Sequence, residues 1–345
     1  MNITYIIGNG FDLNLGFPTD YKHFYRYYTS QPSSTPLIAE FKKNIREYED
    51  KDWKDLEIGL GKYTAKLLNV DDFVAIYVDI QQNISRYMTM VDSFIKKTIN
   101  SQEMRNKIKA HFVTPWSLFP NALKNNLTTF NYNLSRGNPV IINVISLNYT
   151  HTVEYIIPSN DRTFIVNSIS GNIANPKHVH REIGENGLWL GVDNAEQIVN
   201  ESFRDNSVVK TLLLKPTSIQ ESGSTIIEEC SNIISSSNLI CIFGSSLGET
   251  DMSWWKMISS GLANPNCRLI YYTRRGETYV TDQLMYIEQN RIREDLMKLF
   301  DIKTNQLIPN AQNKLYVQIN SDIFRDRDYS SDIEKNYDSI MESEF

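Results

Sequence analysis

Apolar runs that end at glycine or at polar residues alternate along this chain with segments of helical periodicity. The first run, residues 3–7, stops at Gly8-Asn9-Gly10, and a short β-branched and aromatic run of this kind predicts a buried strand. The same pattern predicts further strands at residues 140–147, 163–169, 188–192, 239–243, 268–273 and 314–319. Helices are expected between them, notably over residues 251–262 and 281–300.

Residues 21–120 interrupt this alternation with a stretch that is expected to be helical throughout. Its clearest helix has apolar residues spaced by three and four positions, at Phe73, Ile76, Ile80, Ile84, Met88, Val91 and Ile95. Asp71 and Asp72 stand at the front of that helix, where carboxylates complement the helix dipole. Residues 121–138 are rich in Asn and Ser, which is typical of a loop or a domain boundary.

Strands that alternate with helices indicate a parallel α/β sheet. We therefore predict a doubly wound, Rossmann-type domain made of residues 1–20 and 139–326, with a large all-helical insertion, residues 21–138, after its first strand. The polar and acidic residues 327–345 are expected to form a partly disordered tail.

Composition and charge narrow the class of protein. The 345 residues are 41 % hydrophobic and 22 % charged, as in ordinary globular proteins, and the formal net charge of −6 argues against a large nucleic-acid-binding surface. No run of apolar residues is long enough to span a bilayer and the start lacks a secretory signal, so we expect no membrane association and a cytoplasmic location. Cys230, Cys241 and Cys267 are odd in number and widely spaced, which predicts reduced core thiols.

Two strand-to-helix turns rich in glycine and serine are the first candidate chemistry. Gly8-Asn9-Gly10 follows the first predicted strand, and Gly244-Ser245-Ser246 follows the strand at 239–243. Such turns place backbone N–H groups where α/β proteins bind a pyrophosphate, and two in one sheet could flank a dinucleotide. Alternatively, the glycines only make tight turns, since the third glycine, Gly16, is not at the usual Rossmann spacing.

Asn148 follows the strand at 140–147, at the sheet edge where ligands of open α/β sheets lie. Its amide could bind sugar hydroxyls or a water molecule, or it could cap a helix. His178 and His180 are two residues apart, so on a strand they would face the same way. A single histidine acting as a base is the favoured interpretation and no metal is expected, although a purely structural pair is the alternative. Glu57, on a helix beside Trp53, is expected to be solvated.

The order of these motifs resembles the bacteriophage abortive infection AbiH family over nearly the whole chain. The resemblance is carried by residues 6–13, 16–21 with Phe24, 53–57, 148–150, 178–180, 190–193 and 244–247. It implies a part in defence against phages.

The same landmarks look like a diverged sirtuin-type NAD-binding core. This resemblance implies that Asn148 and His180 are a catalytic pair around the nicotinamide ribose. It also implies that NAD is held by the residues of the two turns and their surroundings: Gly8, Asn9, Gly10, Asp12, Thr19, Gly244, Ser245, Ser246 and Asp251. The sequence departs from sirtuins at Asn9, Thr150 and Arg181, and Arg181 could narrow the pocket or displace His180.

The paired cysteines of the sirtuin zinc module are missing from the sequence, which disfavours an acyl-lysine peptide as substrate and leaves water as the nucleophile. The leading hypothesis is therefore an antiphage effector that binds NAD and hydrolyses its nicotinamide–ribose bond. The alternatives are a sensor that binds NAD or ADP-ribose without turnover, a metal-dependent nucleotide or nucleic-acid hydrolase built on His178, His180 and Asp193, and an interaction module. The sequence leaves open a phage-derived trigger and assembly into a homo-oligomer.

Overall fold

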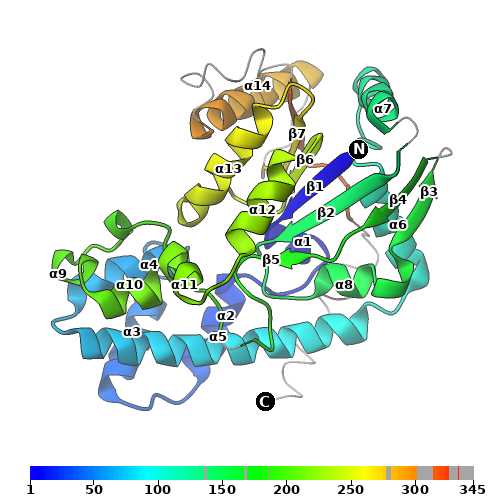
Figure 1. Cartoon of the computed structure of the whole chain (residues 1–345). Coiled ribbons are helices and arrows are strands. Elements are labelled where there is room, and N and C mark those ends of the chain that lie inside the picture. The colour runs from blue at the N-terminus through cyan, green and yellow to red at the C-terminus, as the bar shows by residue number, and fades with distance from the viewer. Residues whose placement is uncertain are drawn as a thin grey trace.

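An eight-stranded, mostly parallel sheet runs through the middle of the molecule in the computed structural model (Figure 1), which describes residues 1–135, 138–166, 169–185, 187–276, 281–300, 314–325 and 333. Its strands are β1 (Asn2–Ile7), β2 (Val140–Ser146), β3 (Thr163–Val166), β4 (Ile169–Ile173), β5 (Lys177–His178), β6 (Leu239–Phe243), β7 (Arg268–Thr273) and β8 (Leu315–Ile319). Their order is β3-β4-β2-β1-β6-β7-β8, and β5 pairs with the end of β2. The described pairs are parallel except β3 with β4, so the predicted parallel α/β class is confirmed at this level.

The central strand β1 is buried on both faces because helices cover both sides of the sheet. Ile3, Tyr5 and Ile7 enter one hydrophobic core, whereas Ile6 points to the opposite core, as the period-two geometry of a strand requires. The second core is closed by α12 (Ile226–Ser235), α13 (Met252–Leu262) and α14 (Asp282–Leu299), which lie together on one side of the sheet (Figure 1). Continuous apolar runs, rather than alternating ones, are what such two-sided burial needs.

The chain between β1 and β2 is helical, as predicted. It comprises α1 (Gly10–Asn14), α2 (Tyr21–Ser30), α3 (Pro36–Tyr48), α4 (Leu56–Tyr63), α5 (Val70–Thr98), α6 (Gln102–Val113) and α7 (Asn121–Ser135). The 29-residue α5 follows the predicted spacing, since Phe73, Ile76 and Ile80 are buried. Several of these helices share the core of the sheet: the Phe112 ring of α6 lies 4.8 Å from the Tyr5 ring. The proposed domain boundaries stay a prediction.

Short helices complete the second half of the chain. They are α8 (Thr152–Ile156), α9 (Glu201–Arg204), α10 (Ser207–Leu213) and α11 (Lys215–Glu221). The three cysteines are free and buried, as expected. Among the described residues, no helix combines the length and the apolar character needed to cross a membrane.

Three local predictions were wrong. Residues 121–138 were expected to form a loop or a domain boundary, and the loop is wrong because Asn121–Ser135 is the helix α7. The polar composition of this helix reflects its exposure, since only Leu127 and Ser135 are buried in it. Residues 188–192 form no strand: this apolar segment packs beside α5, where the Tyr77 hydroxyl donates to the Leu190 carbonyl. Residues 163–169 are not one strand but belong to the antiparallel pair β3 and β4. The predicted tail, 327–345, lies outside the described residues apart from Ile333.

Candidate functional site

The carboxyl ends of β1, β2 and β6 open into one cavity of about 510 Å³. Because parallel strands bring their carboxyl ends to the same edge, residues far apart in the sequence meet there. Ten of the eleven predicted site residues line the cavity: Gly8, Asn9, Asp12, Thr19, Asn148, His180, Gly244, Ser245, Ser246 and Asp251. The eleventh, Gly10, lines a neighbouring cavity on the other side of Gly244. Helices α2 and α4 and the residues just before α4 complete the lining, including Tyr21, Lys22, Lys54 and Glu57.

The glycines of the two turns let the turns touch each other. A Cβ atom on Gly8 would come within 2.7 Å of the Gly244 carbonyl oxygen, and Gly244 itself has a φ of +73° that side chains rarely allow. The N–H groups of Gly8 and Gly10 donate to the carbonyls of Phe243 and Gly244, at 2.9 and 2.7 Å. These two donors are therefore already satisfied, and a phosphate at this turn would have to meet other groups than the predicted N–H pair.

Asn148 is buried just past the end of β2 and lines the cavity. Its Nδ2 donates to the Gly8 carbonyl at 3.3 Å, and its main-chain N–H donates to the Ser146 hydroxyl. Its Oδ1 has no hydrogen-bond partner among the described residues. Asn148 does not cap a helix, because α8 begins four residues later, at Thr152, and carries no side-chain cap.

His180 is a buried residue that lines the same cavity. Its Nδ1 lies 3.2 Å from the Leu147 carbonyl oxygen, which can only accept, so the neutral ring carries its proton on Nδ1 and leaves Nε2 as a base. Nε2 lies 3.2 Å from an Asp251 carboxylate oxygen but makes no hydrogen bond in line with it. Arg181 does not displace His180: its guanidinium lies over the Trp189 ring, 4.4 Å from the ring centroid.

A buried ion cluster, which the sequence analysis missed, holds Asp251. The Lys215 ammonium lies 2.8 Å from Asp251 and 3.0 Å from Glu57, and all three side chains are at most 16 % exposed. Although burial alone would raise the pKa of Asp251, the Lys215 ammonium lowers it below its usual range. Glu57 also accepts the Gly191 N–H at 3.0 Å. The expectation that Glu57 is solvated was therefore wrong, because its partner Lys215 lies far along the sequence.

Asp12 is a buried carboxylate on the floor of the cavity. The Thr150 hydroxyl donates to its Oδ2 at 2.5 Å, whereas its Oδ1 has no partner among the described residues. Burial raises the pKa of Asp12 to about 6, although the hydroxyls of Thr150 and Thr152 act in the opposite direction. Thr19, also in the wall, donates its hydroxyl to the Asn9 amide oxygen.

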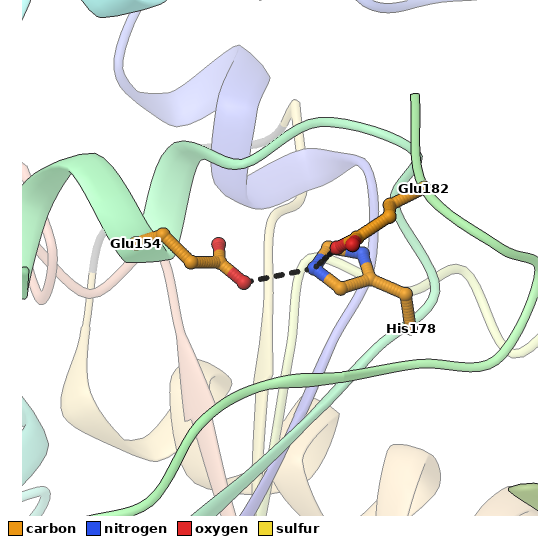
Figure 2. A group of neighbouring side chains, drawn as sticks. All are labelled: Glu154, His178 and Glu182. Carbon is orange, nitrogen blue, oxygen red and sulfur yellow. Dashed lines mark hydrogen bonds and ion pairs between the residues drawn. The ribbon is translucent and has the colours of Figure 1, made fainter. Parts of the chain in front are cut away.

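His178 does not share the cavity with His180, so the prediction that the two face the same way was wrong. His178 instead lies beside Glu154 and Glu182 (Figure 2). Its ring lies 5.8 Å from the His151 ring, and its Nδ1 lies 2.8 Å from the Asn148 carbonyl oxygen. The chain after the two-residue strand β5 turns away from sheet geometry, which removes the alternation on which the prediction depended. Asp193 accepts from Ser253, so the described structure does not gather His178, His180 and Asp193 into a metal site.

Fold and site together define a parallel α/β protein with a polar cavity, of the size that holds a nucleotide, at the carboxyl edge of its sheet. The family model of bacteriophage abortive infection AbiH matches residues 4–273, and the chain belongs to this family. A comparison with curated proteins gave no match. The family connects the chain with abortive infection, the bacterial defence against phages.

Proposed function

We propose that this AbiH protein is an antiphage effector that binds NAD in the cavity and hydrolyses the bond between nicotinamide and ribose. One observation carries the proposal. Three buried polar atoms, Asp12 Oδ1, Asn148 Oδ1 and His180 Nε2, have no hydrogen-bond partner among the described residues, and all three belong to residues that line this cavity. Buried polar groups are almost always paired, so a polar ligand is expected to complete them.

The order of the strands supports a dinucleotide as that ligand. If β1, β2, β4, β6, β7 and β8 are numbered one to six, their order in the sheet is 3-2-1-4-5-6, as in dinucleotide-binding α/β proteins. Ligands of such sheets lie where the strand order reverses, which is here between β1 and β6. Gly8 and Gly244 follow these two strands, and the resemblance to a sirtuin core leads to the same position.

Asn148 and His180 are suited to the two tasks of the reaction. The Asn148 amide is anchored through Nδ2, so Oδ1 can accept a hydrogen bond from a ribose hydroxyl and orient the sugar. The bond from the ribose C1′ to the nicotinamide nitrogen breaks with its electron pair on nicotinamide, and a water oxygen bonds to C1′. His180 Nε2 takes the proton of that water, and Asp251, 3.2 Å away, stabilises the imidazolium that forms.

Cationic side chains across the cavity could meet the phosphates. Lys22 and Lys54 line the wall made by the helical segment, which also contributes the carboxylates of Glu49, Asp50 and Asp55, and the N–H groups of Gly8 and Gly10 are already satisfied. The helical segment would then take part in substrate binding. In this arrangement, residues at the edge of the sheet would contact the reacting ribose, and residues of the helical segment would contact the pyrophosphate.

The test is to incubate the purified protein with NAD and to measure nicotinamide release by chromatography. We expect Asn148→Ala and His180→Ala to lower the rate by at least about a hundredfold, which is typical for removal of a general base or of an orienting group. Matched controls are Asn172→Ala, an exposed amide on β4, and His111→Ala, a histidine on α6 that binds the Phe324 N–H. The melting temperature of each variant separates lost chemistry from lost folding.

Two outcomes would contradict hydrolysis. The first is a wild-type protein that releases no nicotinamide even with lysate of infected cells as a source of the trigger. The second is full activity in both cavity variants. Stoichiometric binding of NAD by calorimetry without turnover would instead select the sensor function. Binding that is lost in Asn148→Ala would then still place the ligand in this cavity.

A further inference from the structure

A second polar cluster lies outside the nucleotide cavity, around His178. Glu154, at the start of α8, and Glu182 both direct a carboxylate at the same imidazole (Figure 2). We propose that Glu154, His178 and Glu182 bind one divalent metal ion of the zinc class. The proposal is independent of NAD cleavage and differs from the expectation that the protein binds no metal.

The distances within the cluster are those of atoms that share an ion. His178 Nε2 lies 2.9 Å from Glu154 Oε1 and 3.5 Å from Glu182 Oε2, and the three ligand atoms lie within 4.8 Å of one another. Ligands bound tetrahedrally at about 2.0–2.1 Å from a metal are about 3.3 Å apart. The three groups therefore need only small movements to bind an ion.

The outer contacts of the histidines have the pattern found at metal sites. His178 Nδ1 lies 2.8 Å from the Asn148 carbonyl oxygen, so it carries a proton and Nε2 is the coordinating atom. A second histidine, His151, repeats the arrangement: its Nδ1 lies 3.1 Å from an Asp92 carboxylate oxygen and its Nε2 lies 3.3 Å from the same Glu182 oxygen. His151 is thus the nearest candidate for a fourth ligand.

The hydrogen bonds and ion pairs of the cluster leave one oxygen of Glu154 without a partner among the described residues. Glu154 Oε2 is buried and has no hydrogen-bond partner among the described residues. A metal ion would give this oxygen a partner, because a carboxylate can bind with both of its oxygens. Imidazole together with carboxylate is a donor set for zinc and related first-row ions.

Access and placement are consistent with an ion that enters from solvent. The side chain of His178 is 6 % exposed, whereas that of Glu182 is 40 % exposed and forms the open side. The bond from His178 to the Asn148 carbonyl places the ion directly behind the loop that carries the cavity amide. A bound ion would therefore stabilise that loop in its observed conformation.

The experiment is calorimetric titration of the full chain with ZnCl₂ after removal of metals with a chelator. We expect one Zn²⁺ per chain. Glu182→Gln keeps the shape of the side chain and removes the charge of a direct ligand. It should weaken Zn²⁺ binding at least about tenfold, because even the loss of a residue that only supports a ligand costs about that much. His178→Ala should abolish stoichiometric binding.

His23→Ala is the matched control, because His23 also lies beside a carboxylate, with its Nδ1 2.7 Å from Asp20. The His23→Ala variant should bind Zn²⁺ with the same affinity as the wild type. Circular dichroism verifies that each variant is folded. If the wild type binds no stoichiometric Zn²⁺, or if Glu182→Gln binds it as tightly as the wild type does, the ion does not occupy this cluster and the proposal is wrong.

Discussion

The buried cation Lys215 offers the most informative test of how the cavity is held together. Lys215→Met keeps the length of the side chain and removes its charge. Glu57 and Asp251 then remain buried, with side chains 6 % and 16 % exposed, and without their shared counter-ion. Breaking a buried ion pair by removing one partner typically costs about 3–5 kcal/mol, because the remaining charge cannot return to water.

This loss is large enough to measure as a change in melting temperature. At about 2.1 cal/mol/K per residue, unfolding of 345 residues has an entropy of about 0.7 kcal/mol/K. A loss of about 3–5 kcal/mol therefore lowers the melting temperature by about 4–7 °C. Calorimetry or circular dichroism at neutral pH resolves such a change.

Lys210→Met is the matched control for this substitution. Lys210 lies on the neighbouring helix α10 and is 37 % exposed, and its partner Asp205 is almost fully exposed. A surface pair of this kind contributes about 0–1 kcal/mol. If Lys215→Met is no more destabilising than Lys210→Met, the buried cluster does not stabilise the fold and the reasoning fails.

The stability difference between wild type and Lys215→Met should also depend on pH in a defined direction. In the wild type, burial alone would raise the pKa of Asp251, but the Lys215 ammonium lowers it by more, so the pKa lies below its usual range. The contribution of Asp251 to stability is thus present above its unfolded pKa and is lost as the pH falls through its folded pKa. Without Lys215 the pKa of the buried Asp251 rises above its usual value, so the variant gains stability as the pH falls from neutral towards about 4. The difference in unfolding free energy between wild type and Lys215→Met should therefore narrow over this range.

Two further substitutions test the floor and the turns of the cavity. Burial raises the pKa of Asp12 to about 6, so ionisation of Asp12 lowers the free energy of unfolding by about 3 kcal/mol in all as the pH rises from about 4 to about 6. Urea unfolding of Asp12→Asn should lack this part of the pH dependence. An unchanged pH profile would contradict the prediction. Gly244→Ala adds a Cβ that overlaps the Phe11 nitrogen at a φ of +73°, so it should cost more than about 1–2 kcal/mol in thermal unfolding. Gly276→Ala, whose Cβ would meet no atom of the described residues within 4 Å, should be nearly neutral. Equal losses in the two glycine variants would refute the close approach of the turns.

The parts of the fold that follow from local pattern could be predicted from the sequence. The strands β1, β2, β6 and β7 are short apolar runs with most residues buried, and β1, β2 and β6 end next to the polar or glycine residues that line the cavity. The same pattern failed at residues 188–192. That apolar segment is buried by α5 rather than by neighbouring strands, and hydrophobicity alone does not distinguish the two.

The partners of the site residues could not be predicted in the same way. Glu57 and Lys215 are 158 positions apart, and nothing near either residue indicates that it is buried. The resemblance to AbiH had included residues 53–57, which was the only signal for Glu57. His178 and His180 were separated because the chain leaves the strand β5 between them, and their two-residue spacing carries no information about where a strand ends.

The central position of β1 has a consequence for how the chain is made. β1 is synthesised first, but its partners β2 and β6 begin roughly 130 and 230 residues later. At about 5–20 residues per second, the ribosome needs about 6–26 s to reach β2, and during that time both edges of an apolar strand have no partner. Among the described residues that line the cavity, Asp251 is the last to be synthesised, so a nascent chain has no complete cavity until most of the protein exists. The cavity therefore cannot be complete before Asp251 has been synthesised.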